Sequence, residues 1–246
     1  MTLFQDIAQR YHQVLERLHR AARTAGRDPD EVHLLVVTKG QPLEKVQAVV
    51  EAGARDLGEN YPEEALPKIQ ALNRPEVRWH MIGHLQRRKA PIVVRHFFMM
   101  HSVDRLKIAR RLERLLAQAD RVLPVFLEFN VGGEESKHGW PAWDPELWPQ
   151  WADEIAEILD MPHLAVQGVM TIPPWNPDPE ASRPYFRRLR ELRDWLARRF
   201  PQGRWHHLSM GMSHDFEVAV QEGATWVRIG TAILGPRPAP QAPSGD

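Results

Sequence analysis

Cysteine is absent from this 246-residue chain, and lysine is scarce, since only six of the 32 basic residues are lysines. A chain without cysteine forms no disulfides, has no thiolate nucleophile, and holds neither an iron–sulfur cluster nor a cysteine-ligated zinc ion. The lack of cysteine suits a reducing compartment, so we expect a cytoplasmic protein. The shortage of lysine makes any lysine at an unusual position informative.

Net charge and long apolar runs are also missing. The 32 Lys and Arg residues balance the 32 Asp and Glu residues, so no overall field attracts polyanions, although a local basic patch stays possible. No segment approaches the roughly 20 apolar residues of a membrane span. The first 26 residues lack the apolar stretch of a signal peptide. We therefore expect neither nucleic acid nor a membrane as a partner.

What the chain does contain is a regular alternation of short apolar runs and longer amphipathic stretches. Hydrophobic residues make up 43% of the chain, as in ordinary globular proteins. An N-terminal helix is predicted from Leu3 to Ala22, closed by Gly26. The predicted strands are His33–Thr38, Arg55–Leu57, Arg78–Ile82, Phe97–His101, Val122–Phe129, His163–Val169, Trp205–Leu208 and Thr225–Ile229. The predicted helices between them are Leu43–Ala52, Tyr61–Leu72, Arg87–Val94, Asp104–Ala119, Pro145–Leu159, Ala181–Phe200 and Ser213–Glu222.

This alternation predicts an α/β protein built as a single (β/α)₈ TIM barrel with an extra N-terminal helix. The alternative is an open doubly wound sheet, but that fold usually carries a glycine-rich turn after its first strand. Here that position reads Thr38-Lys39-Gly40-Gln41-Pro42. We expect one domain over residues 1–235, followed by a proline-rich flexible tail over residues 236–246.

In such a barrel, functional side chains follow the C-terminal ends of the strands. Lys39 follows the first predicted strand, and burial there would lower the pKa of its amine and make it a nucleophile for carbonyl groups. A lysine at a strand end can also simply extend to solvent. Lys39 alone therefore leaves both interpretations open.

Two glycine-containing segments follow the seventh and eighth predicted strands. They are Leu208-Ser209-Met210-Gly211-Met212-Ser213, expected to run from a strand into a helix, and Arg228-Ile229-Gly230-Thr231. Free N–H groups and hydroxyls at this place form the recurrent phosphate site of TIM barrels. The glycines can also be ordinary turn residues, and Ser213 an ordinary helix cap. Together with Lys39, the two segments favour a phosphorylated ligand that bears a carbonyl group, such as pyridoxal phosphate.

Several motifs, in order along the chain, are similar to those of the pyridoxal phosphate homeostasis proteins, the YggS/PROSC family. They are Val37-Thr38-Lys39, Gly58-Glu59-Asn60-Tyr61, Trp79-His80-Met81-Ile82-Gly83-His84-Leu85-Gln86, Ser136-Lys137-His138-Gly139, Leu208-Ser209-Met210-Gly211-Met212-Ser213 and Val227-Arg228-Ile229-Gly230-Thr231-Ala232. The resemblance spans Leu35 to Gly235. One departure is Arg88-Lys89, where family members usually have asparagine before the lysine.

The resemblance implies a barrel like the N-terminal domain of alanine racemase, with pyridoxal 5′-phosphate held as a Schiff base on Lys39. It implies that the phosphate lies on Ser209, Ser213, Gly230 and Thr231 and that Arg228 faces the pyridine nitrogen. The same motifs add Asn60, His80, Met210 and Gly211 to the expected cofactor-binding residues.

Arg228 bears on whether the chain is an enzyme. An arginine, which stays charged, disfavours a proton on the pyridine nitrogen and so weakens the ring as an electron sink. Racemisation also needs a second base, and only three tyrosines are present, of which Tyr61 alone lies on a predicted rim loop. The sequence therefore favours holding the cofactor over turning over a substrate.

Three other features have simpler interpretations. Lys137 is expected to be a solvated loop lysine, and the alternative is an amine that helps to receive or release the cofactor. The pairs His80/His84 and His206-His207 lack a supporting carboxylate cluster, so no metal site is predicted. The arginines of residues 183–199 alternate with apolar residues, which predicts a solvated outer helix.

The leading hypothesis is thus a monomeric pyridoxal 5′-phosphate carrier, with cofactor-requiring apoenzymes as possible recipients. An amino-acid racemase is the first alternative. A Schiff-base aldolase acting on a phosphorylated sugar is the second.

Overall fold

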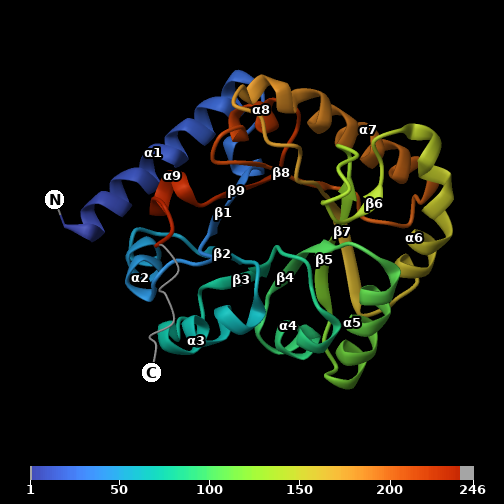
Figure 1. The fold of residues 1–246 in the computed structure, drawn as a ribbon, viewed down its shortest axis with the longest axis horizontal. Coiled ribbons are helices and arrows are strands. Elements are labelled where there is room, and N and C mark those ends of the chain that lie inside the picture. The colour runs from blue at the N-terminus through green and yellow to red at the C-terminus, as the bar shows by residue number, and fades with distance from the viewer. Residues whose placement is uncertain (1, 239–246) are drawn as a thin grey trace.

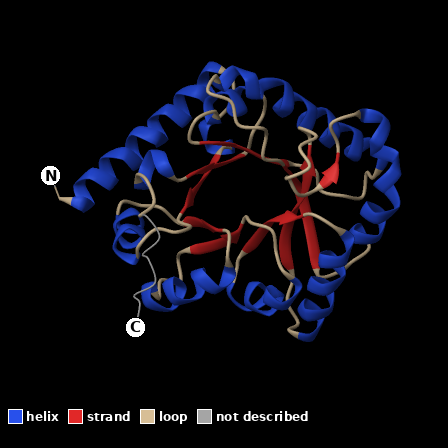
Figure 2. Cartoon of the chain, viewed as in Figure 1, coloured by secondary structure: helices blue, strands red, loops and turns tan. Residues whose placement is uncertain are grey.

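The computed structural model describes residues 2–238, whose strands form a closed parallel barrel encircled by helices (Figures 1 and 2). Eight strands surround the axis, β9 pairs with β1 to close the ring, and the two-residue β6 attaches to β5 outside it. The strands are β1 (His33–Val37), β2 (Asp56–Glu59), β3 (Arg78–Met81), β4 (Met99–Val103), β5 (Leu123–Asn130), β6 (Trp140–Pro141), β7 (Leu164–Met170), β8 (His207–Met212) and β9 (Trp226–Ile229). The predicted TIM barrel is confirmed.

The helices follow the strands in alternation and cover the outside of the barrel (Figure 2). The α-helices are α1 (Leu3–Thr24), α2 (Leu43–Glu51), α3 (Pro62–Leu72), α4 (Ala90–His96), α5 (Leu106–Gln118), α6 (Ala152–Leu159), α7 (Arg183–Arg199), α8 (Phe216–Gln221) and α9 (Thr231–Leu234). Short 3₁₀ segments are η1 (Pro29–Glu31), η2 (Arg87–Lys89), η3 (Pro145–Trp151) and η4 (Pro179–Ser182). No helix within residues 2–238 is long and apolar enough to cross a membrane.

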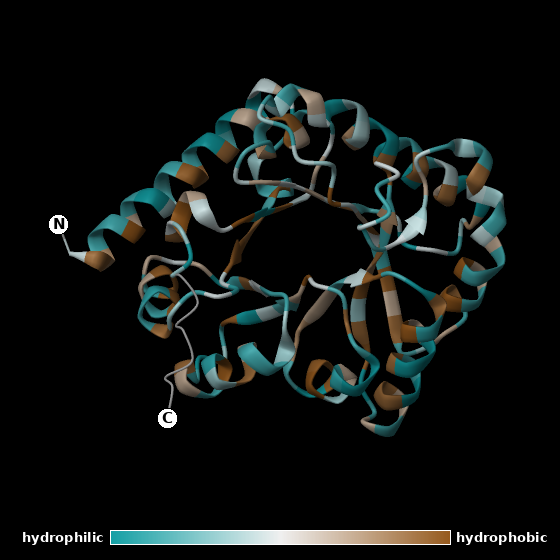
Figure 3. Ribbon diagram, viewed as in Figure 1, coloured by the Kyte–Doolittle hydropathy of each residue, from teal (hydrophilic) through white to brown (hydrophobic). Residues whose placement is uncertain are grey.

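The predicted N-terminal helix is α1, which packs on α2, α8 and α9 and so covers the seam where the barrel closes. A capping box starts it, since the N–H of Gln5 donates to Thr2 and the Gln5 side chain accepts from the Thr2 N–H. Its buried residues recur at helical spacing, as Ile7, Tyr11, Val14 and Leu18 show. Figure 3 shows this alternation of hydrophobic and hydrophilic residues along α1.

Apolar side chains form two layers. The larger core lies between strands and helices, and a smaller cluster fills the barrel interior. The interior cluster consists of Leu35, Ile82, Met99, Phe126, Met170 and Trp226. Among these apolar residues the interior also holds polar ones, because the His80 and His101 rings lie 5.2 and 5.4 Å from the Trp226 ring. The interior of this barrel is therefore partly polar.

Some predicted boundaries were wrong. The strand predicted at 97–101 begins at Met99, because the Phe97 N–H still bonds to Val93 O and ends α4. The strand predicted at 205–208 is β8, which continues to Met212. Most of the expected glycine loop is therefore strand.

Candidate functional site

Lys39 lies two residues after the end of β1, and the intervening Thr38 bonds to an ion pair between buried Glu59 and partly buried Lys68. The Glu59 carboxylate, at the end of β2, accepts hydrogen bonds of 2.7 Å from Thr38 Oγ1 and from Lys68 Nζ. Lys68 comes from α3 and also donates to Thr38 O at 2.8 Å. This contact ties the residue before Lys39 to the neighbouring strand and helix. Sequence analysis singled out Lys39 but not Lys68.

The Lys39 amine is partly buried, and burial is the main reason why its pKa lies below the ordinary lysine value. The positive charges of Arg237 and Arg228 lower the pKa further, while Glu59 opposes them. A lowered pKa increases the fraction of neutral amine at neutral pH, and the neutral amine is the nucleophile. Lys39 therefore has the environment expected of a lysine that bonds a carbonyl group.

Two adjoining hollows share Lys39, Thr231 and Arg237, and we call them together the Lys39 pocket. The inner hollow, of about 510 Å³, is lined by Val37, Lys39, Asn60, Ile82, Ile172, Trp175, Met212, Ser213, His214, Arg228, Gly230, Thr231 and Arg237. The outer one, of about 860 Å³, is lined by Lys39, Gly40, Tyr61, Glu64, Thr231, Pro236, Arg237 and Pro238. The pocket combines amine, hydroxyl and guanidinium groups with apolar walls, which is typical of small-ligand sites.

The structure brings most of the predicted cofactor residues together at this pocket. Those that line it are Lys39, Asn60, Ser213, Arg228, Gly230 and Thr231. Those that do not line it are His80, Ser209, Met210 and Gly211, all of which are buried. Met210 belongs to the core between strands and helices. Gly211 has φ 93°, and a Cβ there would lie 2.5 Å from that of Ala219. It therefore permits close packing of α8 on β8.

The predicted helix start at Ser213 was wrong. Asp215 forms a turn there, because its Oδ1 accepts the Met212 N–H at 2.7 Å, and α8 begins only at Phe216. Ser213 lies in this turn and lines the pocket, with its hydroxyl 3.4 Å from the Ala232 N–H at the start of α9. The hydroxyl of Ser213 thus faces the same pocket as Thr231, but as a turn residue and not as a helix cap.

Arg228 reaches the pocket from β9, yet its guanidinium is anchored in the barrel interior. Nη1 donates to Ser209 Oγ and Nη2 to Thr171 O, both at 2.8 Å. Burial lowers its pKa to about 10, while the charges of Glu128 and Asp215 oppose that shift. Arg228 therefore remains a cation at neutral pH and is held by two acceptors.

Below Ser209, polar side chains continue in an unbroken series through the interior. Ser209 Oγ is 3.0 Å from His101 Nδ1, and His101 Nε2 is 3.0 Å from His80 Nδ1. His80 Nε2 is 2.8 Å from an oxygen of Asp56, which forms a bidentate pair with Arg78. We call Arg228, Ser209, His101, His80 and Asp56 the interior chain. Sequence analysis placed three of its members, Arg228, Ser209 and His80, at the cofactor and missed both His101 and Asp56.

Arg237 is the main pocket residue that sequence analysis missed, since it lies in the segment expected to be a flexible tail. Pro236, Arg237 and Pro238 line the outer hollow, and the Arg237 side chain lies against Gly40. Lys45 and Gln41 hold the preceding residues by donating to Leu234 O and Gly235 O. The rest of the expected tail, 239–246, lies outside the described residues.

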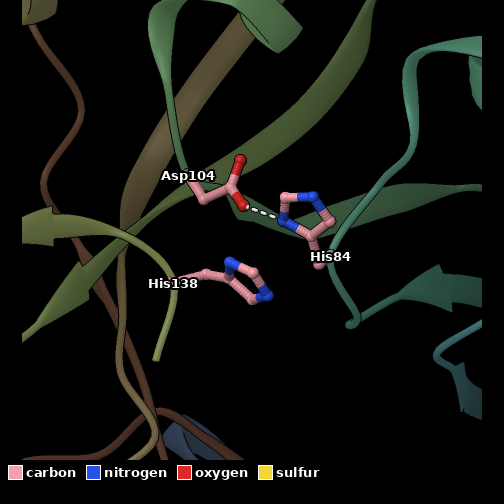
Figure 4. Close-up of side chains that lie close together, drawn as sticks. All are labelled: His84, Asp104 and His138. Carbon is pink, nitrogen blue, oxygen red and sulfur yellow. Dashed lines mark hydrogen bonds and ion pairs between the residues drawn. The ribbon is translucent and has the colours of Figure 1, made fainter. Parts of the chain in front are cut away.

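A separate cluster lies on the rim, where His84, Asp104 and His138 approach one another (Figure 4). His84 Nδ1 is 2.5 Å from an Asp104 oxygen, and the rings of His84 and His138 stack with centroids 3.9 Å apart. The Arg105 guanidinium bonds to the other Asp104 oxygen. The two rings lie in nearly parallel planes, 24° apart, so their in-plane lone pairs stay in separate planes, and the Arg105 guanidinium already pairs with the carboxylate. Both features oppose metal binding. The absence of a metal site stays a prediction.

Lys137 lies on the same rim but does not line the Lys39 pocket. Its Nζ is 3.8 Å from an oxygen of Glu134, and both side chains are partly exposed. Nearby Glu128 is buried, and burial together with the Asp104 charge raises its pKa to about 8. These contacts agree with a solvated loop lysine near a protonated carboxyl group.

Comparisons with known proteins place the chain in one family. The family description of the alanine racemase N-terminal domain matches residues 11–238. The chain belongs to this family. Among its members, a protein of Aquifex aeolicus named pyridoxal phosphate homeostasis protein is 42% identical, with 94% of this chain and 99% of the relative aligned. A Pseudomonas aeruginosa protein of the same name is 43% identical over 94% and 96% of the two chains.

Solved structures agree with the barrel. PipY of Synechococcus elongatus, solved with pyridoxal phosphate bound, is 32% identical with a TM-score of 0.77 over 90% of this chain and 100% of PipY. Its structure without the cofactor gives a TM-score of 0.79 at 33% identity. An alanine racemase of Clostridium difficile, 14% identical, matches with a TM-score of 0.68 over 61% of its length. That similarity shows the shared fold alone.

Proposed function

We propose that this chain binds pyridoxal 5′-phosphate in the Lys39 pocket and serves in the homeostasis of that cofactor. The observation that carries the proposal is the pocket itself. An amine of lowered pKa, two hydroxyl groups and an anchored guanidinium line one hollow at the C-terminal rim of the barrel. The names of the relatives and the cofactor bound to PipY support it.

Two details of the pocket fit this cofactor. Asn60 Oδ1 is buried and has no hydrogen-bond partner among residues 2–238, so it is free for a donor from a ligand. A Cβ at Gly230 would lie 3.1 Å from Val37 O. A side chain there would push against β1 just before Lys39, so glycine lets the loop after β9 lie close to β1.

The residues divide into ligand groups and supports. Lys39 would bond the aldehyde carbon of the cofactor through its amine, with loss of water. The bound cofactor supplies an electron-withdrawing ring and a reactive carbon–nitrogen double bond. Ser213, Gly230 and Thr231 would hold the phosphate, and Arg228 would donate to the pyridine nitrogen. Four of the predicted cofactor residues do not line the pocket and would act through the residues they support. These are Ser209, Met210, Gly211 and His80.

Carriage is favoured over turnover because guanidinium groups, and no carboxylate, are among the described side chains that line the inner hollow. Arg228 stays charged and donates hydrogen bonds only, so it withholds the ring proton that strong carbanion stabilisation requires. As a carrier the chain would be a monomer that delivers the cofactor to apoenzymes. Transfer to an apoenzyme would then proceed without any amino-acid substrate.

Amino-acid racemisation is the second candidate, and one observation favours it. Tyr61 is 53% exposed and lines the outer hollow together with Lys39. Exchange of the α-hydrogen of alanine for deuterium would report such turnover. Exchange that disappears in Tyr61→Phe would establish the racemase, whereas its absence in the wild type supports the carrier.

The proposal is tested by adding pyridoxal 5′-phosphate to the purified protein, removing the unbound cofactor and recording the absorbance spectrum of the protein. We expect a long-wavelength band in the wild type and in Lys137→Ala, and none in Lys39→Ala. Lys137→Ala is the matched control because it removes another partly exposed rim lysine. A wild type that cannot be reconstituted, or a band that persists in Lys39→Ala, would refute the proposal.

A further inference from the structure

The interior chain has two ends whose chemistry sets the direction of every hydrogen bond between them. Arg228 can only donate, because a guanidinium has no acceptor. Asp56 can only accept, since its pKa is lowered and it is ionised. Burial alone would raise that pKa, but the hydrogen bonds and the electrostatic attraction of His80 and Arg78 together outweigh burial. A series fixed at both ends in this way has few possible proton arrangements.

The first arrangement keeps both histidines neutral. His80 Nε2–H donates to Asp56, so His80 Nδ1 carries a lone pair and accepts from His101 Nε2–H. His101 Nδ1 then accepts the hydroxyl proton of Ser209, whose oxygen accepts from Arg228. Every donor meets an acceptor, and all four bonds point from Arg228 toward Asp56.

The second arrangement adds a proton to the series and makes one histidine a cation. His101 Nδ1–H would then donate to Ser209 Oγ, which already accepts from Arg228. The Ser209 hydroxyl proton would have no acceptor among the contacts of residues 2–238. A second cation would also lie close to Arg228 in a site that is fully buried. The first arrangement is therefore the stable one.

The surroundings of both rings agree with neutral histidines. His101 faces His80, His207 and Arg228, and all three disfavour a positive charge there. His80 faces Asp56, which favours the charge, but also Arg78 and His33, which oppose it. Apolar rings of Phe126, Phe98 and Trp226 complete the surroundings. Burial is the largest effect on both histidines and lowers the pKa of each.

We propose that His101 is a positioning residue that fixes Arg228 toward the Lys39 pocket through Ser209, and that it does so as the neutral tautomer protonated on Nε2. Because the Ser209 proton is directed at His101, that hydroxyl is not available to donate to a phosphate. The predicted phosphate role of Ser209 is thereby replaced by support of Arg228. The effect on the cofactor rests on the function proposed above, whereas the tautomer does not.

The tautomer is tested on the protein without cofactor by ¹⁵N NMR of the histidine ring nitrogens, with His80→Gln and His101→Asn used to assign signals. We expect both rings to be protonated on Nε2 and neither to titrate between pH 8 and pH 6. Protonation of His101 on Nδ1, or a titration midpoint near 6.5, would overturn the proposal. This result does not depend on whether pyridoxal phosphate binds.

The positioning role is tested by comparing pyridoxal 5′-phosphate affinity in His101→Leu and His101→Asn. Asparagine retains an acceptor near the Nδ1 position, whereas leucine has none. We expect about tenfold weaker binding for leucine, the upper end of what one hydrogen bond between neutral groups contributes, and less than threefold for asparagine. His206→Asn, at an exposed histidine, should bind as the wild type. Equal losses for both His101 variants would show a packing role and overturn the proposal, and if leucine prevents folding, the NMR result decides.

Discussion

The pocket and the interior beneath it contain similar residue types but differ in how their polar groups are satisfied. In the Lys39 pocket, Asn60 Oδ1 lacks a partner among the described residues, and Thr231 is exposed. In the interior chain, each of Ser209, His101 and His80 has a partner on both sides. Unsatisfied groups mark a surface that awaits a ligand, and satisfied groups mark its support. The two regions should therefore respond differently to substitution.

The largest expected effect comes from removing ligand groups of the Lys39 pocket. Ser213→Ala combined with Thr231→Val removes two hydroxyl groups from the pocket and leaves the interior chain intact. Because a hydrogen bond to a charged group contributes about 1.5–3 kcal/mol, affinity for pyridoxal 5′-phosphate should fall at least a hundredfold. Fluorescence titration measures it. Affinity within threefold of the wild type would place the phosphate elsewhere.

Ser209→Ala changes the interior chain, and it should lower the stability of the protein more than a substitution in the pocket does. It leaves His101 Nδ1 without a donor and Arg228 Nη1 without an acceptor, and both groups are buried. Each unsatisfied buried group costs about 1–3 kcal/mol. Urea unfolding should show a lower free energy of unfolding for Ser209→Ala than for Ser213→Ala. Equal stabilities of the two variants would contradict the distinction between ligand group and support.

A smaller effect is expected on the pH dependence of stability. Burial keeps the folded-state pKa of His101 well below the ordinary histidine value of 6.5, so the unfolded chain binds more protons between those two values. The contribution of neutral His101 to the free energy of unfolding should therefore be present in full above pH 6.5 and should decrease as the pH drops below 6.5. His101→Asn should reduce this slope by about 1.4 kcal/mol per pH unit for one proton. Urea midpoints at pH 7, 6 and 5 measure it, with His206→Asn as control, and an unchanged slope would argue against a neutral His101.

The barrel could be predicted from the sequence because each strand and each helix has its own pattern of hydrophobic residues. Strands with both faces covered are continuously apolar, and helices such as α1 keep one buried face. Boundaries failed where a single side chain decides them. Asp215 delays α8 by accepting the Met212 N–H, a contact that helical periodicity does not encode.

The candidate site was predicted in part for a related reason. Lys39 follows a strand and Arg228 lies in one. The alternation of strands and helices is therefore enough to predict that both residues reach the mouth of the barrel. His80 and Ser209 have the same alternation but lie lower, and height within the barrel depends on strand stagger, which local sequence does not show. Arg237 was missed because its segment resembles a proline-rich tail. Its position depends on distant contacts from Lys45 and Gln41.

The central claim, that Lys39 holds the cofactor, has a direct test. Pyridoxal 5′-phosphate is added to the full chain, the carbon–nitrogen double bond is reduced with borohydride, and the modified peptide is located by mass spectrometry. We expect the label on Lys39 alone at one equivalent of cofactor. A label on Lys137 or another lysine, or no label, would contradict the account.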